Sequence, residues 1–191
     1  MKLNLELSDL YEMQKALDAR IIADKGLEGQ DLLPNTVLAL QVEIGELANE
    51  WRGFKHWSND REPRTKVIVK DPLGQCEGYV KNPLLEEYVD CLHFILSLGR
   101  QLNYDISRYE QEILIDEFKD VREAFQHVFN WIVNLDFMRE NGIRSGVEKC
   151  YKRLCDVFLT LGLMLGFTFD QIVAAYVEKN KINHERQANG Y

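Results

Sequence analysis

Two pairs of carboxylates with the same spacing stand out in this chain. Glu43 and Glu46 lie three residues apart in the segment Asn35 to Trp51, and Glu87 and Asp90 repeat that spacing. Both segments have the apolar pattern of buried helices, and residues three apart on a helix share a face. Like charges on a packed face are unfavourable unless they are paired or bound to metal. The two pairs therefore predict four carboxylates that converge on divalent cations.

The predicted ligands are all carboxylate oxygens, and this limits the kind of cation that they bind. They suit hard cations, so we expect Mg²⁺, with Mn²⁺ as the alternative. Mg²⁺ keeps several waters and usually shares its coordination shell with substrate phosphates. A cluster of this kind is typical of an enzyme that hydrolyses a nucleotide polyphosphate with a metal-activated water.

The C-terminal stretch from Lys179 to Tyr191 is polar and locally basic. Lys179, Asn183 and either Arg186 or Gln187 share a face if the last helix continues through them. Cationic and amide donors gathered in one place can bind phosphate oxygens. The competing interpretation is a frayed, solvated terminus, which is common.

Composition and charge limit the classes of protein. The chain has 191 residues, of which 46% are hydrophobic and 28% charged, with a formal net charge of -8. These values are ordinary for a globular protein, and we expect a single domain over residues 1–191. An acidic surface disfavours binding to nucleic-acid polymers and to anionic membranes, so we expect neither as a partner.

The cysteines and the N-terminus bear on the compartment. Cys76, Cys91, Cys150 and Cys155 form no C-x-x-C pair, and apolar neighbours surround two of them. The segment 1–10 lacks the apolar stretch of a signal peptide. We therefore expect a reducing, cytoplasmic location.

Helical periodicity dominates the chain, so we expect an all-α fold. It would be a helical bundle with about six main helices, four of which form the core around the active site. The expected helices run from a Ser8 cap to Lys25, from an Asn35 cap to Trp51, from an Asn82 cap through Pro83 to about Leu98, from Ile106 or Tyr109 to Phe137, from a Ser145 capping box to Leu165, and from a Thr168 capping box to about Asn183.

The segment 58–82 interrupts this helical pattern. Residues Thr65 to Val69 have the composition of a short strand, and Asp71-Pro72-Leu73-Gly74 is a turn signal. A small β-hairpin and a mobile flap both fit. Long connections of this kind are uncommon and often functional.

Two further polar residues lie in apolar helical segments. By pattern alone Gln14 is a solvated residue of the first helix. His93 follows Asp90 by three residues, which would allow it to bind metal, but a packing histidine is the more common case.

The carboxylate pairs resemble the metal-binding signature of the all-α, MazG-like nucleoside triphosphate pyrophosphohydrolase superfamily. The chain is similar in particular to the dimeric dUTPase family. The matching residues are Leu10 to Gln14, Glu43 to Trp51, Phe54-Lys55-His56-Trp57, Glu87 to Asp90, and Lys179-Asn180-x-x-Asn183-x-x-Arg186-Gln187-x-x-Gly190-Tyr191. The C-terminal motif is the most specific part of the resemblance.

The resemblance implies an activity and a set of roles. The activity is hydrolysis of dUTP, and often dUDP, to dUMP by a homodimer whose sites lie near the interface. The resemblance implies that Glu43, Glu46, Glu87 and Asp90 bind Mg²⁺, and that one of the first pair, Glu46 in preference to Glu43, orients or deprotonates the attacking water. It implies phosphate contacts from Lys55, Lys179 and Arg186, and a nucleotide contact from Asn183, with Gln187 in the same motif. It also implies that Gln14 contacts uracil and that Trp57 forms a wall of the pocket.

Three alternatives remain open at this point. One is a related pyrophosphohydrolase that prefers dCTP or modified nucleotides, because metal ligands do not report the base. Another is a carboxylate-bridged di-iron or di-manganese bundle, although only Asp90 and His93 approach its Glu-x-x-His spacing. The last is a non-catalytic helical interaction module, which leaves the like-charged pairs unexplained.

Overall fold

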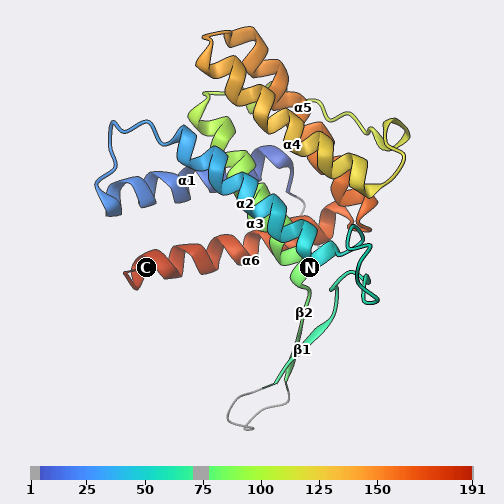
Figure 1. Cartoon of the computed structure of the whole chain (residues 1–191). Coiled ribbons are helices and arrows are strands. Elements are labelled where there is room, and N and C mark those ends of the chain that lie inside the picture. The colour runs from blue at the N-terminus through green and yellow to red at the C-terminus, as the bar shows by residue number, and fades with distance from the viewer. Residues whose placement is uncertain (1–4, 71–77, 191) are drawn as a thin grey trace.

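The protein is described by a computed structural model of residues 5–70 and 78–190 (Figure 1). These residues contain six α-helices and one two-stranded antiparallel sheet, so the predicted all-α fold is confirmed. The elements are α1 (Leu7–Lys25), α2 (Leu33–Trp51), β1 (Val67–Val69), β2 (Tyr79–Lys81), α3 (Pro83–Gln101), α4 (Val121–Glu140), α5 (Arg144–Met164) and α6 (Phe169–Ala188).

Helix α3 lies at the centre of the molecule. It packs along α2 and contacts both α1 and α6, which also contact each other. The antiparallel pair α4 and α5 covers the other side, where α4 packs against α2 (Figure 1). Within the described ranges no single helix is long and apolar enough to cross a membrane, and α5 with α6 meets that test only as a pair bent by 107°.

The core is built around large side chains with little room to spare. The Tyr88 ring stacks on the Phe158 ring with centroids 4.4 Å apart, and its hydroxyl donates to the Phe158 carbonyl oxygen. Gly162 lies against this ring: a Cβ atom there would approach the Tyr88 hydroxyl oxygen to 2.4 Å. A tyrosine therefore fits between α3 and α5 only because α5 carries glycine at this point.

The predicted helix starts are only partly correct. Asn82 caps α3 by accepting from the Leu85 N–H, and Thr168 forms the predicted capping box with Gln171. The Ser8 cap is wrong, since α1 begins at Leu7 and the Asp9 carboxylate accepts from the Glu6 N–H.

The predicted caps at Asn35 and Ser145 are also wrong. Helix α2 begins two residues before Asn35, with Pro34 in its first turn, where proline needs no hydrogen-bond partner. Helix α5 begins at Arg144 and lacks the Ser145 capping box.

The long helix predicted from Ile106 or Tyr109 is wrong in its first part. Residues 106–120 contain two single-turn 3₁₀ helices, Ile106–Arg108 and Ile115–Glu117, and α4 begins only after an Asp120 cap. The cause is competition for backbone donors. The buried Asp156 carboxylate accepts from the Glu112 N–H, and the Thr160 hydroxyl accepts from the Leu114 N–H, so this segment bonds to α5 and not to itself.

The described part of the segment 58–82 contains a pair of short antiparallel strands, which agrees with the hairpin, one of the two predicted alternatives. Strands β1 and β2 pair in register Ile68 to Val80 and extend away from the helices (Figure 1). The predicted turn at Asp71 to Gly74 and Cys76 lie outside the described residues.

The close approach of Gly162 to Tyr88 gives a stability prediction. We expect Gly162→Ala to lower the free energy of unfolding by about 1–3 kcal/mol, because an added methyl group must displace a fully packed ring. Gly45→Ala is the matched control: no heavy atom lies within 4 Å of its added Cβ, so we expect a gain of about 0.5–1 kcal/mol from helix propensity. Urea denaturation measures both, and equal effects would contradict the packing argument.

Candidate active site

Helix α2 presents two carboxylates beside α3. Its buried face, which includes Leu40, Ile44 and Leu47, packs into the core. That packing fixes the rotation of the helix and turns Glu43 and Glu46 together toward α3. Glu43 is half-buried and Glu46 is exposed, so the two carboxylates differ in their access to water.

Three of the four predicted metal ligands meet. One carboxylate oxygen each from Glu43, Glu46 and Glu87 lies within 4.8 Å of the other two. Oxygens bound to one Mg²⁺ or Ca²⁺ ion, at roughly 2.0–2.6 Å from it, have separations within this range. The donor set is all oxygen, which fits a hard cation. These three side chains would therefore hold a divalent ion without a change of fold.

The fourth predicted ligand has a different partner. Asp90 lies one turn beyond Glu87 on α3, and its Oδ2 accepts a hydrogen bond from Lys179 Nζ of α6 at 2.5 Å. Both side chains are mostly buried. The ammonium group of Lys179 thus provides a positive charge next to the three glutamates.

The electrostatics of the cluster follow from this crowding. Burial, then the charge of Asp90, then the neighbouring glutamates raise the pKa of Glu43 and of Glu87 to about 7. Burial also raises the pKa of Asp90, against the opposing effect of Lys179. Negative charge on this face is therefore unfavourable until a cation compensates it.

A cavity of about 280 Å³ connects the acidic face with the basic end of α6. Its wall comes from α1, α2, α3 and α6. Of the predicted site residues, the structure places these at the cavity: Gln14, Glu43, Asp90, Lys179, Asn183 and Arg186. The four-helix arrangement thus gathers carboxylates, cations and amides from distant parts of the sequence around one space.

The prediction that Gln14 is solvated is wrong. Its exposed fraction is 4%, and its amide makes three hydrogen bonds. Oε1 accepts from the Tyr176 hydroxyl at 2.8 Å and from His93 Nδ1 at 2.6 Å, and Nε2 donates to Asp18 Oδ1 at 2.7 Å. Gln14 therefore joins α1 to α3 and α6 in the wall of the cavity.

His93 belongs to this wall and not to the carboxylate cluster. Its ring stacks on Tyr176 with centroids 4.1 Å apart. Burial and the charge of Lys179 lower the pKa of His93 to about 3, so the ring is neutral at pH 7. Its Nε2 is buried and has no hydrogen-bond partner within the described part of the chain.

Five predicted residues do not line the cavity: Glu46 and Glu87, which belong to the carboxylate cluster beside it, and Lys55, Trp57 and Gln187. Lys55 Nζ lies 5.7 Å from the centre of the Phe54 ring, and Trp57, with an exposed fraction of 67%, contacts Phe54 and His56 edge-on. Gln187 is half-buried near the end of α6 and does not line the cavity. One chain by itself therefore does not bring these three residues to the others.

The sequence interpretation missed a second group of residues in the wall. Asp18 Oδ2 accepts from Ser97 Oγ at 2.8 Å and from Arg100 Nε at 2.6 Å. Asp18 follows Gln14 by four residues, so helix geometry alone places both on one face. The bonds from α3 leave no trace in the sequence, because Ser97 and Arg100 occur at ordinary positions near a helix end.

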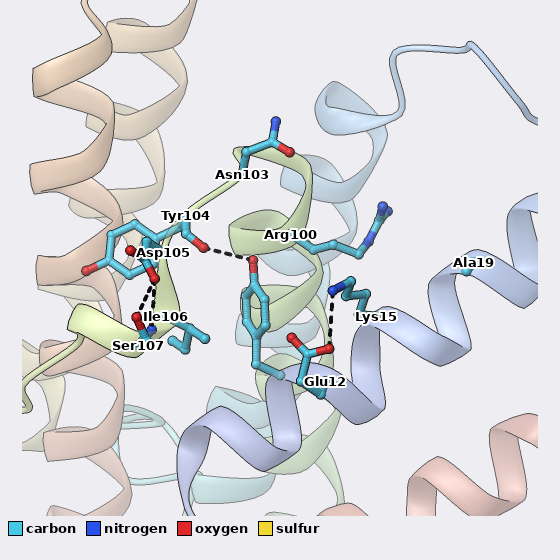
Figure 2. A pocket seen from close by; sticks show the side chains of 10 residues that line it. Glu12, Lys15, Ala19, Arg100, Asn103, Tyr104, Asp105, Ile106 and Ser107 are labelled. Carbon is cyan, nitrogen blue, oxygen red and sulfur yellow. Dashed lines mark hydrogen bonds and ion pairs between the residues drawn. The ribbon is translucent and has the colours of Figure 1, made fainter.

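The larger hollow between α1 and the end of α3 is a different feature. It measures about 660 Å³ and is lined by residues of α1, the end of α3 and the segment that follows (Figure 2). The Glu12–Lys15 ion pair and the bond from the Tyr11 hydroxyl to the Tyr104 carbonyl oxygen lie along it. None of the predicted site residues lines it. Arg100 does, and it links this hollow to Asp18.

The raised carboxyl pKa values predict how stability varies with pH when no metal is bound. The pKa of Glu43 and of Glu87 is about 7 in the folded protein, against an ordinary value of 4.5. The unfolded chain therefore binds fewer protons between about pH 5 and 7, and the free energy of unfolding falls as pH rises through this window. Urea denaturation in a chelator measures this fall.

We expect Mg²⁺ to raise the melting temperature of the wild-type protein. Glu87→Gln should remove this rise, and it should also reduce the change in the free energy of unfolding between about pH 5 and 7. The matched control is Glu86→Gln, at the adjacent residue, which pairs with Lys81 at 3.5 Å and should leave both effects intact. The same pH slope in both variants would contradict the assignment.

Comparison with known proteins agrees with this geometry. A family model described as dUTPase matches residues 6–72 and 77–191, which is nearly the whole chain. A search of curated proteins finds no match. The matched region contains the carboxylates of α2 and α3, the Gln14 wall and the basic end of α6. The chain belongs to the dUTPase family, in its all-α, MazG-like branch.

Proposed function

We propose that this protein hydrolyses dUTP to dUMP and pyrophosphate, and also accepts dUDP, in a reaction that depends on Mg²⁺. Membership of a dUTPase family supports a nucleotide pyrophosphohydrolase in general. The observation that carries the proposal is one cavity lined by Glu43 of the carboxylate cluster and by Asp90, together with Lys179, Asn183 and Arg186. A nucleotide polyphosphate needs both a cation site and basic donors.

Glu43, Glu46 and Glu87 are the proposed Mg²⁺ ligands, with Asp90 as the fourth. Bound Mg²⁺ would neutralise phosphate charge and lower the pKa of a coordinated water. Asp90 is held by Lys179 when substrate is absent. Phosphate oxygens would compete for the Lys179 ammonium, so substrate binding would free Asp90 for the cation. Mn²⁺ fits the same oxygen ligands.

Glu46 is the proposed group that orients or deprotonates the attacking water. It is the most exposed of the three clustered glutamates, so water reaches its carboxylate. Glu43 and Glu87 are half-buried and face each other, which suits them to hold a cation. With these roles, water attacks the phosphate and no side chain has to act as a nucleophile.

Lys179, Asn183 and Arg186 lie along one side of α6 and are the proposed contacts to the phosphates and sugar. Lys55, Trp57 and Gln187 lie outside the cavity, so their proposed substrate contacts require a movement. The segment after α2, from the same chain or from a second copy, would have to close over the nucleotide. This requirement agrees with a site near a dimer interface.

A homodimer is the proposed assembly. Helices α2 and α4 pack against each other and carry large apolar side chains that face solvent: Leu38, Val42, Val133 and Phe137. Exposed apolar side chains on neighbouring helices are typical of a surface that a partner covers. We also propose that the chain is one domain in the cytoplasm; the free, buried cysteines of the described residues, Cys91, Cys150 and Cys155, support a reducing compartment.

The structure weakens one of the alternatives. A di-iron bundle requires histidine ligands in the carboxylate cluster, but His93 bonds to Gln14 and stacks on Tyr176. A related enzyme with another base preference keeps the same carboxylates, so only the wall around Gln14 distinguishes the two.

Activity assays test the proposal directly. We expect pyrophosphate release from dUTP with Mg²⁺, and a fall of at least 10²-fold in kcat for Glu46→Gln, a loss typical of removing a group that takes a proton in the transition state. Glu50→Gln is the matched control, since Glu50 lies on the same helix but pairs with Arg64 at 3.0 Å. Full activity in Glu46→Gln would contradict its role, and no hydrolysis of any nucleotide would contradict the function.

The assembly has its own test. Light scattering should give twice the chain mass of 22.3 kDa, and Phe137→Glu should reduce this to a monomer because its side chain, 56% exposed, would bring a charge into the covered surface. The control Lys119→Glu changes the charge of a side chain that is 89% exposed, before α4 begins. A monomeric wild-type protein would contradict the proposed dimer.

A further inference from the structure

We propose that Asp18 is a positioning residue that fixes the Gln14 amide as a hydrogen-bond donor toward the cavity, and thereby selects a pyrimidine with a carbonyl group at that edge over one with an amino group. This inference rests on the proposed function, which supplies the nucleotide. It deepens that function by giving a physical reason for uracil over cytosine.

The first step is the hydrogen-bonding capacity of Gln14. Its amide has two acceptor positions on Oε1 and two N–H donors on Nε2. His93 and Tyr176 occupy both acceptor positions, and Asp18 takes one donor. The group that remains is the second N–H. Since Gln14 lines the cavity, it offers a ligand a donor and no acceptor.

The opposite orientation of the amide would present an acceptor, and two of its three neighbours would tolerate it. Neutral His93 can place its proton on either ring nitrogen, so Nδ1 can donate to Gln14 or accept from it. The Tyr176 hydroxyl also lies 3.2 Å from the Leu10 carbonyl oxygen, to which it can donate instead. Neither residue decides which way the amide points.

Asp18 does decide. An ionised carboxylate only accepts, so an inverted amide would place Gln14 Oε1 against Asp18 Oδ1, now 2.7 Å from Nε2. Donors on α3 hold the carboxylate in place from the other side: Ser97 Oγ at 2.8 Å and Arg100 Nε at 2.6 Å. With an exposed fraction of 8%, Asp18 cannot exchange this contact for water without local rearrangement.

The consequence concerns the edge of the base. Uracil carries carbonyl oxygens at C2 and C4 on either side of its ring N3–H, and the proposed donor on Gln14 pairs with the C4 oxygen. Cytosine keeps the C2 oxygen but carries an amino group at C4, and an amino group facing the Gln14 N–H leaves both donors unpaired. Buried polar groups left unpaired discriminate by roughly 10²–10⁵ in kcat/KM, depending on the site. The donor does not discriminate against thymine, whose carbonyl groups are the same.

The experiment compares kcat/KM for dUTP and dCTP in wild-type protein and in Asp18→Asn. We expect the wild type to prefer dUTP by at least roughly 10²-fold. The substituted amide has nearly the same shape and can still accept from Ser97 and Arg100, but its N–H₂ can also donate to an inverted Gln14. The dUTP to dCTP ratio should then fall by at least tenfold.

The matched control is Glu12→Gln, which makes the same carboxylate-to-amide change on α1 at a residue that pairs with Lys15 and lies away from Gln14. It should keep the wild-type ratio. A folded Asp18→Asn variant with an unchanged ratio overturns the inference while dUTP hydrolysis stands. If the wild type cleaves dCTP as well as dUTP, the inference is again overturned alone. If it cleaves no nucleotide with Mg²⁺ or Mn²⁺, the proposed function itself has failed.

A second measurement on the wild type decides the case in which Asp18→Asn does not fold. In 2-thio-dUTP and 4-thio-dUTP one carbonyl oxygen is replaced by sulfur, a much weaker acceptor. If Gln14 donates to the C4 oxygen, 4-thio-dUTP should lose at least tenfold in kcat/KM relative to 2-thio-dUTP. Equal values for both analogues, or a loss confined to 2-thio-dUTP, would overturn the inference, because cytosine shares the C2 oxygen.

Discussion

The structure depends on the electrostatic crowding of carboxylates between α2 and α3. Both helices are packed along most of their length, and this packing leaves Glu43, Glu46 and Glu87 within reach of a single cation. Their position raises the pKa of the two half-buried glutamates to about 7, so the folded chain holds the site against its own repulsion. Lys179 of α6 relieves part of that repulsion through Asp90. The docking of α6 is thus both a packing event and a charge-compensating one.

The wall of the cavity around Gln14 carries fewer carboxylates than the metal face and is held by hydrogen bonds between helices. Tyr176, His93 and Gln14 form one hydrogen-bonded group, and Asp18 joins it to α3. Each hydrogen bond in such a buried network restricts the orientation of the groups that it joins. The metal face therefore provides reactivity, while this wall provides a fixed pattern of donors. Three helices must be correctly placed for either to exist.

The sequence predicted the carboxylate pairs because a spacing of three residues and an apolar surround are local properties. It also predicted the caps at Asn82 and Thr168, and it allowed a hairpin as one of two interpretations of the segment 58–82, because these features depend on adjacent residues. Gln14 was misjudged because its partners lie on α3 and α6, far away in the sequence. The prediction for residues 106–120 was wrong for a similar reason: the side-chain oxygens that accept from its backbone N–H groups belong to Asp156 and Thr160 on α5. Patterns report local periodicity, and tertiary hydrogen bonds can override it.

The central claim is that the carboxylates of α2 and α3 bind the cation that acts on a nucleotide. The most direct test is a crystal structure with Mn²⁺ and a non-hydrolysable dUTP analogue, in which anomalous scattering locates the metal. The account predicts Mn²⁺ bonded to Glu43, Glu46 and Glu87, with Lys179 moved from Asp90 to a phosphate oxygen. Metal bound elsewhere, or a nucleotide outside the Gln14 cavity with the Lys179–Asp90 pair intact, would contradict it.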